Sequence, residues 1–316
     1  MRDRAYISFL FHLLLFPCSE MVGISAAFAE EGDASTMTAF FVPAEPNLDW
    51  SSPQGLTTTA LRNYLLAVAN PYLHPIGHSV VSLHCPRSQR ERTIWAAVTG
   101  GSNRGDLERL LFDGLGAGIL LMEFDGRLQE GDEAKEVVSR RVWNGKARWI
   151  RAEISDEACV RAISYYRFFK TNRVYRRFRA DYRPLNGNGS GCAGFVLSFF
   201  EVIGVSFDYK DFSREIRIPL NLFSTSSRRV SVWSLMLSSR AREWSRAGEE
   251  SVMLSIIDPS EVYKWIGNHS DFTKGENFLS GIEKSGVNID ARDVPLPDIS
   301  AFPIFTENHI ENLDAE

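Results

Sequence analysis

An apolar segment preceded by alternating glycines constrains the fold of this chain more than any other stretch. It runs from Asn186 to Gly204 and reads NGNGSGCAGFVLSFFEVIG. Glycine loses more backbone entropy on ordering than any other residue, so such a loop must gain something from being ordered. The residues from Cys192 onward are apolar enough for a buried helix, with Gly204 as its C-terminal cap. The pattern therefore predicts a fixed helix N-terminus that carries one cysteine.

Three explanations for the glycines can be compared. A phosphate-binding loop would need a lysine and then Ser or Thr, or the spacing G-x-G-x-x-G, whereas here the glycines are two residues apart and Cys192-Ala193 follow. Two explanations stay open. One is a packed turn with a buried cysteine. The other is an activated nucleophile: with Ser190 as N-cap, Cys192 lies in the first turn, where free N–H groups stabilise a thiolate and can hold an oxyanion.

A nucleophilic thiol needs a base, and three histidines cluster in the sequence LHPIGHSVVSLHC. His78 opens a β-rich run directly after Gly77, so it could face a cleft. His84 has the same strand parity near the far end of that run, and His74 lies in the preceding loop. Each could equally be a structural histidine. The spacing matches no zinc motif, so no metal is expected.

The expected elements alternate between helix and strand, which indicates an α+β fold. A helix over 57–71 presents Leu61, Leu65 and Val68 on one face, and Ser155 caps a second helix over 156–178. The runs 78–85 and 92–101 form an antiparallel hairpin. Further strands are expected at 116–124, 146–154 and 214–223, and a helix at 258–267. The predicted organisation is a signal peptide (1–29), a flexible lead-in (30–55), one domain (56–284) and an irregular tail (285–316).

The N-terminus has the layout of a secretory signal. Arg2 and Arg4 precede an apolar run over 7–16, and Ala27-Phe28-Ala29 follows, so cleavage is expected after Ala29. The apolar run is too short to span a bilayer, although an uncleaved anchor is the alternative. The protein is thus expected in the periplasm or secreted. Its net charge of −5 argues against nucleic-acid binding.

Without the signal, three cysteines remain. An odd count in an exported protein permits one disulfide and one free thiol. If Cys85 and Cys159 pair, Cys192 is left over; if none pair, all three are small core residues.

These motifs together resemble a known superfamily. The order of motifs is a Gly-His at a strand start, a hairpin, a helix ending in basic and aromatic residues, and then GSGCAGFVLSFFEVIG. This order is similar to that of the circularly permuted NlpC-type papain-like hydrolases and acyltransferases, over about residues 60–205. The resemblance implies an antiparallel sheet packed against the cysteine helix, with Cys192 as nucleophile and His78 as base. A third polar residue on the next strand would orient the imidazole. Thr99 occupies that position, where an Asp, Asn or His is usual.

The resemblance implies an exported cysteine hydrolase that cleaves an amide or ester, such as a cell-wall peptide, without a cofactor. The alternatives are a non-catalytic envelope binding or structural protein, and a thiol acyltransferase acting on lipid. The partner would be a peptide, cell-wall or lipid substrate, with no nucleic acid and no membrane span after signal cleavage; the oligomeric state stays open. Five arginines between 173 and 183 would form a basic rim for an anionic substrate or a solvated helix face.

Overall fold

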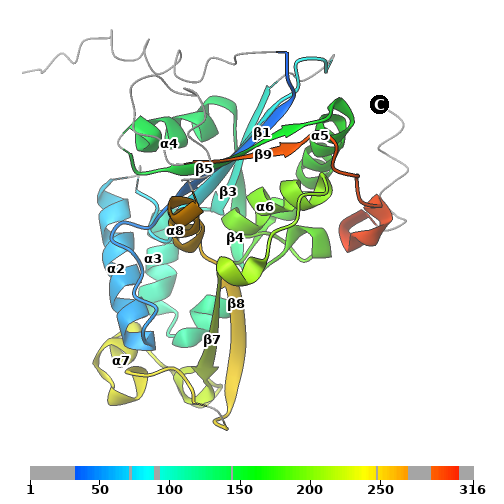
Figure 1. The fold of residues 1–316 in the computed structure, drawn as a ribbon. Coiled ribbons are helices and arrows are strands. Elements are labelled where there is room, and N and C mark those ends of the chain that lie inside the picture. The colour runs from blue at the N-terminus through cyan, green and yellow to red at the C-terminus, as the bar shows by residue number, and fades with distance from the viewer. Residues whose placement is uncertain are drawn as a thin grey trace, which may run out of the picture.

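A single sheet organises the computed structural model, which describes residues 33–70, 73–88, 93–143, 145–246, 248–269 and 286–305. Its strand order is β6-β4-β3-β2-β1-β5-β9 (Figure 1). Neighbouring strands are antiparallel except for β5 and β9, which are parallel. The predicted α+β class is therefore confirmed. The strands are β1 (Thr36–Val42), β2 (His78–His84), β3 (Thr93–Gly100), β4 (Phe124–Glu130), β5 (Arg148–Ile154), β6 (Arg177–Phe178) and β9 (Gly286–Ala291).

The sheet separates two apolar layers. In β1, Met37, Ala39 and Phe41 pack with residues of α5 (Asp156–Thr171), α6 (Cys192–Val202) and α8 (Pro259–His269). The alternate residues Phe40 and Val42 pack instead with α4 (Gly131–Trp143), on the opposite face (Figure 1). Because successive side chains of a strand point to opposite faces, each sheet residue can be assigned to the α6 face or to the α4 face.

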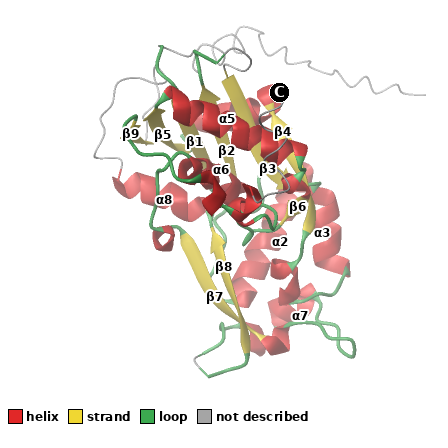
Figure 2. Ribbon diagram, turned by 90° about the vertical axis from the view of Figure 1, so that its right-hand side faces the viewer, coloured by secondary structure: helices red, strands yellow, loops and turns green. Residues whose placement is uncertain are grey.

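A smaller group of elements extends from one end of the sheet. Figures 1 and 2 show α7 (Val232–Leu237) and the antiparallel hairpin of β7 (Ser213–Pro219) and β8 (Ser251–Ile257) at this end of the molecule. They have their own apolar core, to which Ile218, Leu235 and Leu254 belong. The helices α2 (Pro53–Ala69) and α3 (Asn103–Phe112) pack against each other, and α2 also contacts α7.

Several local predictions are confirmed. The runs 78–85 and 92–101 form the hairpin of β2 and β3, and β5 lies within 146–154. The Ser155 side chain caps α5 by accepting from the Ala158 N–H. The apolar segment after the glycine loop is α6, and Gly204 follows it with a φ of +88°. The helices predicted at 57–71 and 258–267 are α2 and α8.

The predicted lead-in and tail are wrong. The segment 30–55 contains β1, whose seven residues are all buried in the middle of the sheet. Thr36 and Thr38 are buried like the apolar residues of β1, so TMTAFFV has no polar face and lacks the alternation that marks a half-buried strand. The segment 285–316 contains β9, which pairs with β5. Both parts of the chain belong to the main sheet rather than flanking it.

Three further elements differ from the prediction. The strand expected at 116–124 is a 3-10 helix, η1 (Ala117–Leu121), because Gly116 turns the chain with a φ of +59°. In α2, Leu61 is buried as predicted, whereas Leu65 and Val68 are 53% and 45% exposed, so the buried face is only partly the predicted one. The second helix ends at Thr171 rather than 178, since the chain turns at Arg173 in the left-handed region.

Candidate functional site

The glycine loop positions Cys192 as the first residue of α6. The N-cap is Gly191 rather than the predicted Ser190, and no side chain caps the helix. Ser190 pairs with the neighbouring chain segment instead: its N–H donates to the Arg177 carbonyl (2.9 Å), and its carbonyl accepts from the Arg179 N–H (3.2 Å). The Ser190 hydroxyl donates to the Gly191 carbonyl at 2.9 Å, so no side chain caps the first N–H groups of α6.

Close backbone packing explains the glycines of this loop. Gly189 has a φ of +119°, and a Cβ there would lie 2.3 Å from the Arg177 carbonyl oxygen. A Cβ at Gly191 would lie 3.0 Å from the Arg179 carbonyl oxygen. The loop is therefore a packed turn in its backbone, which also delivers the cysteine to a fixed position. The two explanations left open by the sequence are compatible.

The Cys192 thiol is free and buried. Cys85 and Cys159 form a disulfide with their Cα atoms 6.0 Å apart, which leaves Cys192 unpaired. Burial raises the pKa of the Cys192 thiol to about 12, and nearby Asp258 adds to this, whereas the N–H groups of Ala193 and Cys192 and the Ser79 hydroxyl act in the opposite direction. The thiol is therefore protonated at neutral pH, and its reaction as a nucleophile would require a proton acceptor.

The strand β2 presents Ser79, not His78, to this thiol. Ser79 pairs with Phe41, on the α6 face, and its hydroxyl has no hydrogen-bond partner of normal geometry among the described residues. His78 pairs with Val42, whose side chain belongs to the α4 face. The predicted direct contact between the His78 imidazole and the thiol is therefore not formed, because one residue of strand parity separates the two faces.

His78 has a different partner on its own face. Its Nε2 lies 2.9 Å from the Gln129 Oε1, and the Gln129 amide donates in turn to Glu133 of α4 at 3.2 Å. With the amide in this orientation, His78 donates from Nε2. Burial lowers the pKa of His78 to about 4. Gln129, rather than Thr99, thus holds the ring; Thr99 pairs with Arg127 on β4 and only borders the same small pocket as His78.

Of the other two histidines of the cluster, only His74 borders the small pocket that Cys192 also borders. The His74 ring stacks on His78, with centroids 4.1 Å apart and planes at 9°, and burial lowers its pKa. The Nε2 atom of His74 is buried without a hydrogen-bond partner among the described residues. His84 is at the far end of β2, beside Thr93, as its position in the sequence predicted.

A small pocket nevertheless connects the two faces at the end of the sheet. Cys192, His78, Thr99 and Asp106 all border it, and its volume is about 30 Å³, enough for about two water molecules. Asp106 comes from the first turn of α3, and burial raises its pKa to about 6. The predicted residues are thus neighbours of one pocket, although the thiol and the imidazole do not point at each other across the sheet.

A larger cavity of about 150 Å³ is also bordered by Cys192, at the N-terminus of α6. Its walls are mostly aliphatic and aromatic and come from α2, α3, η1 and β8, together with the segment before α2. At its polar end the N-terminus of α6 (Gly191, Cys192 and Ala193) meets that of α8 (Asp258 and Pro259). The apolar walls include Leu48, Trp50, Leu56, Ala60, Ile76, Leu110, Ile119, Leu120, Met122, Phe124, Phe178, Leu254, Ile256 and Ile257.

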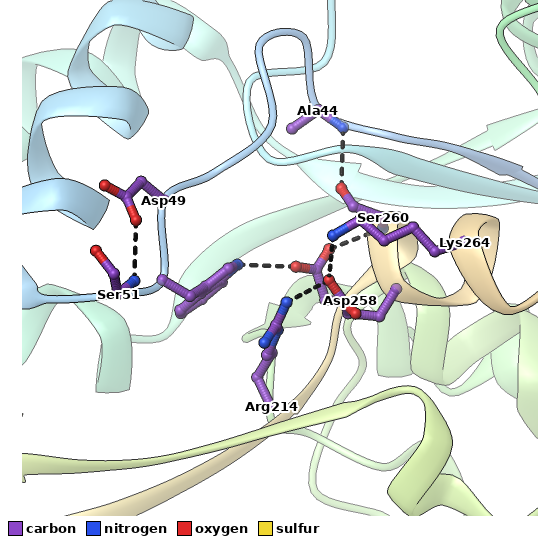
Figure 3. A network of polar contacts seen from close by, with 9 residues as sticks. Ala44, Asp49, Ser51, Arg214, Asp258, Ser260 and Lys264 are labelled. Atoms are coloured by element: carbon purple, nitrogen blue, oxygen red, sulfur yellow. Dashed lines mark hydrogen bonds and ion pairs between the residues drawn. The ribbon is translucent and has the colours of Figure 1, made fainter.

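Asp258 is held rigidly at this polar end (Figure 3). Its carboxylate accepts from the Trp50 indole N–H and from the Ser260 backbone N–H, both at 2.8 Å. The Ser260 hydroxyl accepts in turn from the Ala44 N–H at 3.2 Å, which ties α8 to the end of β1. Asp258 is 3% exposed, and burial raises its pKa.

Sequence reasoning missed Ser79, Gln129 and Asp258 as site residues. The segment DPSE does predict a capped helix, which the structure has as α8, but nothing local places its first turn beside Cys192. Ser79 adjoins His78 in the sequence, and only the strand pairing shows which of the two faces the thiol. Gln129 lies two strands away from His78 in the sheet, so no sequence spacing relates them.

Three of the five arginines before the loop are engaged within the protein. Arg177 pairs with Glu123 at 3.0 Å, and Arg183 lies over the Tyr209 ring. Arg179 binds Asp181 and the Leu121 carbonyl, and it also borders the cavity. These three therefore do not form the open basic rim considered for an anionic substrate.

The chain matches no protein-family model, no curated protein and no solved structure. Within the described residues, no helix is both long and apolar enough to cross a bilayer. The same residues contain no group of three or more His, Cys, Asp or Glu side chains placed to hold a metal ion. None of these comparisons tests the resemblance to the permuted NlpC-type superfamily, which stays a prediction from the sequence.

Proposed function

We propose that this protein binds a small apolar molecule, such as an acyl group, in the cavity beside Cys192. The observation that carries the proposal is the cavity of about 150 Å³ with aliphatic and aromatic walls. Cavities of this size with apolar walls accept apolar ligands of about the size of benzene. A short acyl segment has similar bulk and would gain the hydrophobic free energy of leaving water.

The polar end of the cavity favours a neutral carbonyl head group. The uncapped N–H groups at the start of α6 can donate to a carbonyl oxygen, and the positive end of the helix dipole supports this. Asp258 borders the same end, so a carboxylate would be repelled wherever Asp258 is ionised. Arg179 also lines the cavity, but its guanidinium is already paired with Asp181, so an ester or amide of an acyl group suits the site better than a free fatty acid.

The proposed setting is the cell envelope or the secreted fraction. The Cys85–Cys159 disulfide supports this, because disulfides persist in oxidising compartments and are rare in the cytosol. The signal-like N-terminus lies outside the described residues, so its cleavage remains a prediction.

The binding proposal is tested by filling the cavity. Ala60 lines it from α2, and Ala60→Phe places a ring in that space. We expect methyl esters of short fatty acids to raise the melting temperature of the wild type and to bind at least about tenfold more weakly to Ala60→Phe. Val160→Phe is the matched control, since Val160 is 58% exposed on α5. Equal binding by all three proteins, or none by the wild type, would refute the proposal.

A second candidate is a cysteine hydrolase or acyltransferase, favoured by the position of the free thiol. Cys192 lies at a helix N-terminus, on the wall of the cavity, and shares a small pocket with His78. In this reaction Sγ bonds to the acyl carbonyl carbon while the thiol proton passes to a base. The alcohol or amine leaves with a proton, and water or another acceptor then takes the acyl group. The base would be His78, acting through a bridging water, or Asp258.

Acylation of Cys192 tests the second candidate separately. Wild-type protein would be mixed with p-nitrophenyl esters of short fatty acids and the adduct located by peptide mass spectrometry. The hydrolase proposal expects an acyl-Cys192 thioester, its absence in Cys192→Ala and much slower formation in His78→Asn. If the wild type forms no adduct and Cys192→Ala still binds the ester, the hydrolase proposal is refuted and the binding proposal stands.

A further inference from the structure

The end of the molecule that carries α7 has an unusual exposed surface. Figures 1 and 2 show α7 and the tip of the β7–β8 hairpin at this end. We define the α7 surface as the exposed side chains of residues 217–246. It belongs neither to the sheet nor to the polar end of the cavity, and the proposed function does not use it.

Large apolar side chains project from the α7 surface. Trp233 and Leu237 are 54% and 81% exposed, and they are four residues apart, so they lie on one face of α7. The opposite face carries Val232 and Leu235, which are buried. Leu220, just before the preceding loop, is 42% exposed. The helix is therefore apolar on both sides, although only one side has a partner within the described chain.

The charge of the α7 surface is opposite to that of the whole protein. Residues 217–246 contain six arginines and a single acidic residue, Glu243, in a chain whose net charge is −5. Arg228 and Arg229 precede α7, and Arg240 and Arg242 follow it. None of these four arginines forms an ion pair with a carboxylate of the described residues, whereas Arg246 pairs with Glu243.

We propose that the α7 surface docks the protein on an anionic lipid bilayer. Arginines on both sides of α7 would be attracted to lipid phosphates, and the tryptophan and leucine between them would insert at the level of the head groups. The net positive charge of this surface favours an anionic partner, and the exposed tryptophan and leucine between the arginines favour a bilayer as that partner. Docking would bring the cavity near the lipid, since Leu254 and Ile256 line the cavity and also belong to the core of this end.

Vesicle co-sedimentation tests the proposal. The exported chain, with its N-terminus checked by mass spectrometry, would be mixed with vesicles of phosphatidylcholine alone or of an equimolar mixture with phosphatidylglycerol. We expect binding to the anionic vesicles only, released by high salt. The double variant Arg229→Gln/Arg240→Gln should bind about twenty-five-fold more weakly, at about fivefold for each arginine. Trp233→Ser should weaken binding about tenfold or more.

Matched variants separate docking from general effects on charge and exposure. Val160→Ser removes another exposed apolar side chain, 58% exposed on α5, and Arg62→Gln removes an exposed arginine of α2. Both should bind as the wild type does, and circular dichroism would verify that every variant is folded. Absence of wild-type binding to anionic vesicles would overturn the proposal, as would equal losses in the control variants. Acyl-ester binding in the cavity is measured without vesicles and would survive either result.

Discussion

Protonation of the buried histidine pair is expected to destabilise the fold at mildly acidic pH. His78 donates to Gln129 and stacks on His74, and burial disfavours the charged form of both rings. The charged groups facing His78 are Arg127, which lowers its pKa further, and Glu133, which raises it. The perturbation is a change of pH from 7 to 5, compared between the wild type and His78→Gln.

The size of the effect follows from the two pKa values of His78. Its pKa is about 4 in the folded protein and 6.5 for the unperturbed ring, so the unfolded chain binds more protons between these values. The contribution of the neutral His78 ring to the free energy of unfolding is therefore complete above pH 6.5 and is lost as the pH falls toward 4. Between pH 7 and pH 5 the free energy of unfolding should fall by about 2 kcal/mol on account of His78 alone. His74 changes it in the same direction, because burial also lowers the pKa of His74.

Urea unfolding at the two pH values measures this difference. His78→Gln removes the titrating ring, so its unfolding free energy should change less with pH than that of the wild type, by about 2 kcal/mol. His269→Gln is the control, because His269 is a partly exposed ring on α8. If wild type and His78→Gln lose the same stability on acidification, the His78 ring is not a buried neutral group, and the reasoning fails.

The remaining predictions concern the cysteines, the loop and the N-terminus. Replacing Cys85 and Cys159 by serine should lower the unfolding free energy by about 4 kcal/mol in urea, because the bridge closes a loop of 74 residues; no loss would contradict a disulfide in the folded protein. In the native protein at pH 8, iodoacetamide should alkylate Cys192 at least about a hundredfold more slowly than in urea, since burial raises its pKa to about 12; equal rates would show an exposed thiolate. Gly189→Ala should cost about 2 kcal/mol or more in urea unfolding through its positive φ; an unchanged stability would contradict the close backbone packing of the loop. Mass spectrometry of the exported chain should find the N-terminus after Ala29, and a chain retaining the first residues would contradict the signal peptide.

The sequence alone determined the elements whose signals are local. The hairpin of β2 and β3 follows from two β-rich runs around a polar turn, and the start of α5 from the capping hydroxyl of Ser155. The glycines before Cys192 indicated a close approach of two backbone segments that a side chain would block. Gly189 makes such an approach to the Arg177 carbonyl. In each case the residues that decide the conformation are close together in the chain, or they are glycines, whose missing side chain is visible in the sequence.

Tertiary structure decided the rest, because strand pairing and burial depend on residues far away in the chain. The strand β1 became an interior strand of the sheet only through partners on both sides, β2 and β5. The register of β1 with β2 assigned Ser79 to the face of Cys192 and His78 to the face of α4, and a shift of one residue would have exchanged them. The first turns of α6 and α8, 66 residues apart between Cys192 and Asp258, meet at one cavity only after the sheet has formed. The sequence could therefore identify the cysteine, whereas its neighbours were decided by which faces the folded sheet buries.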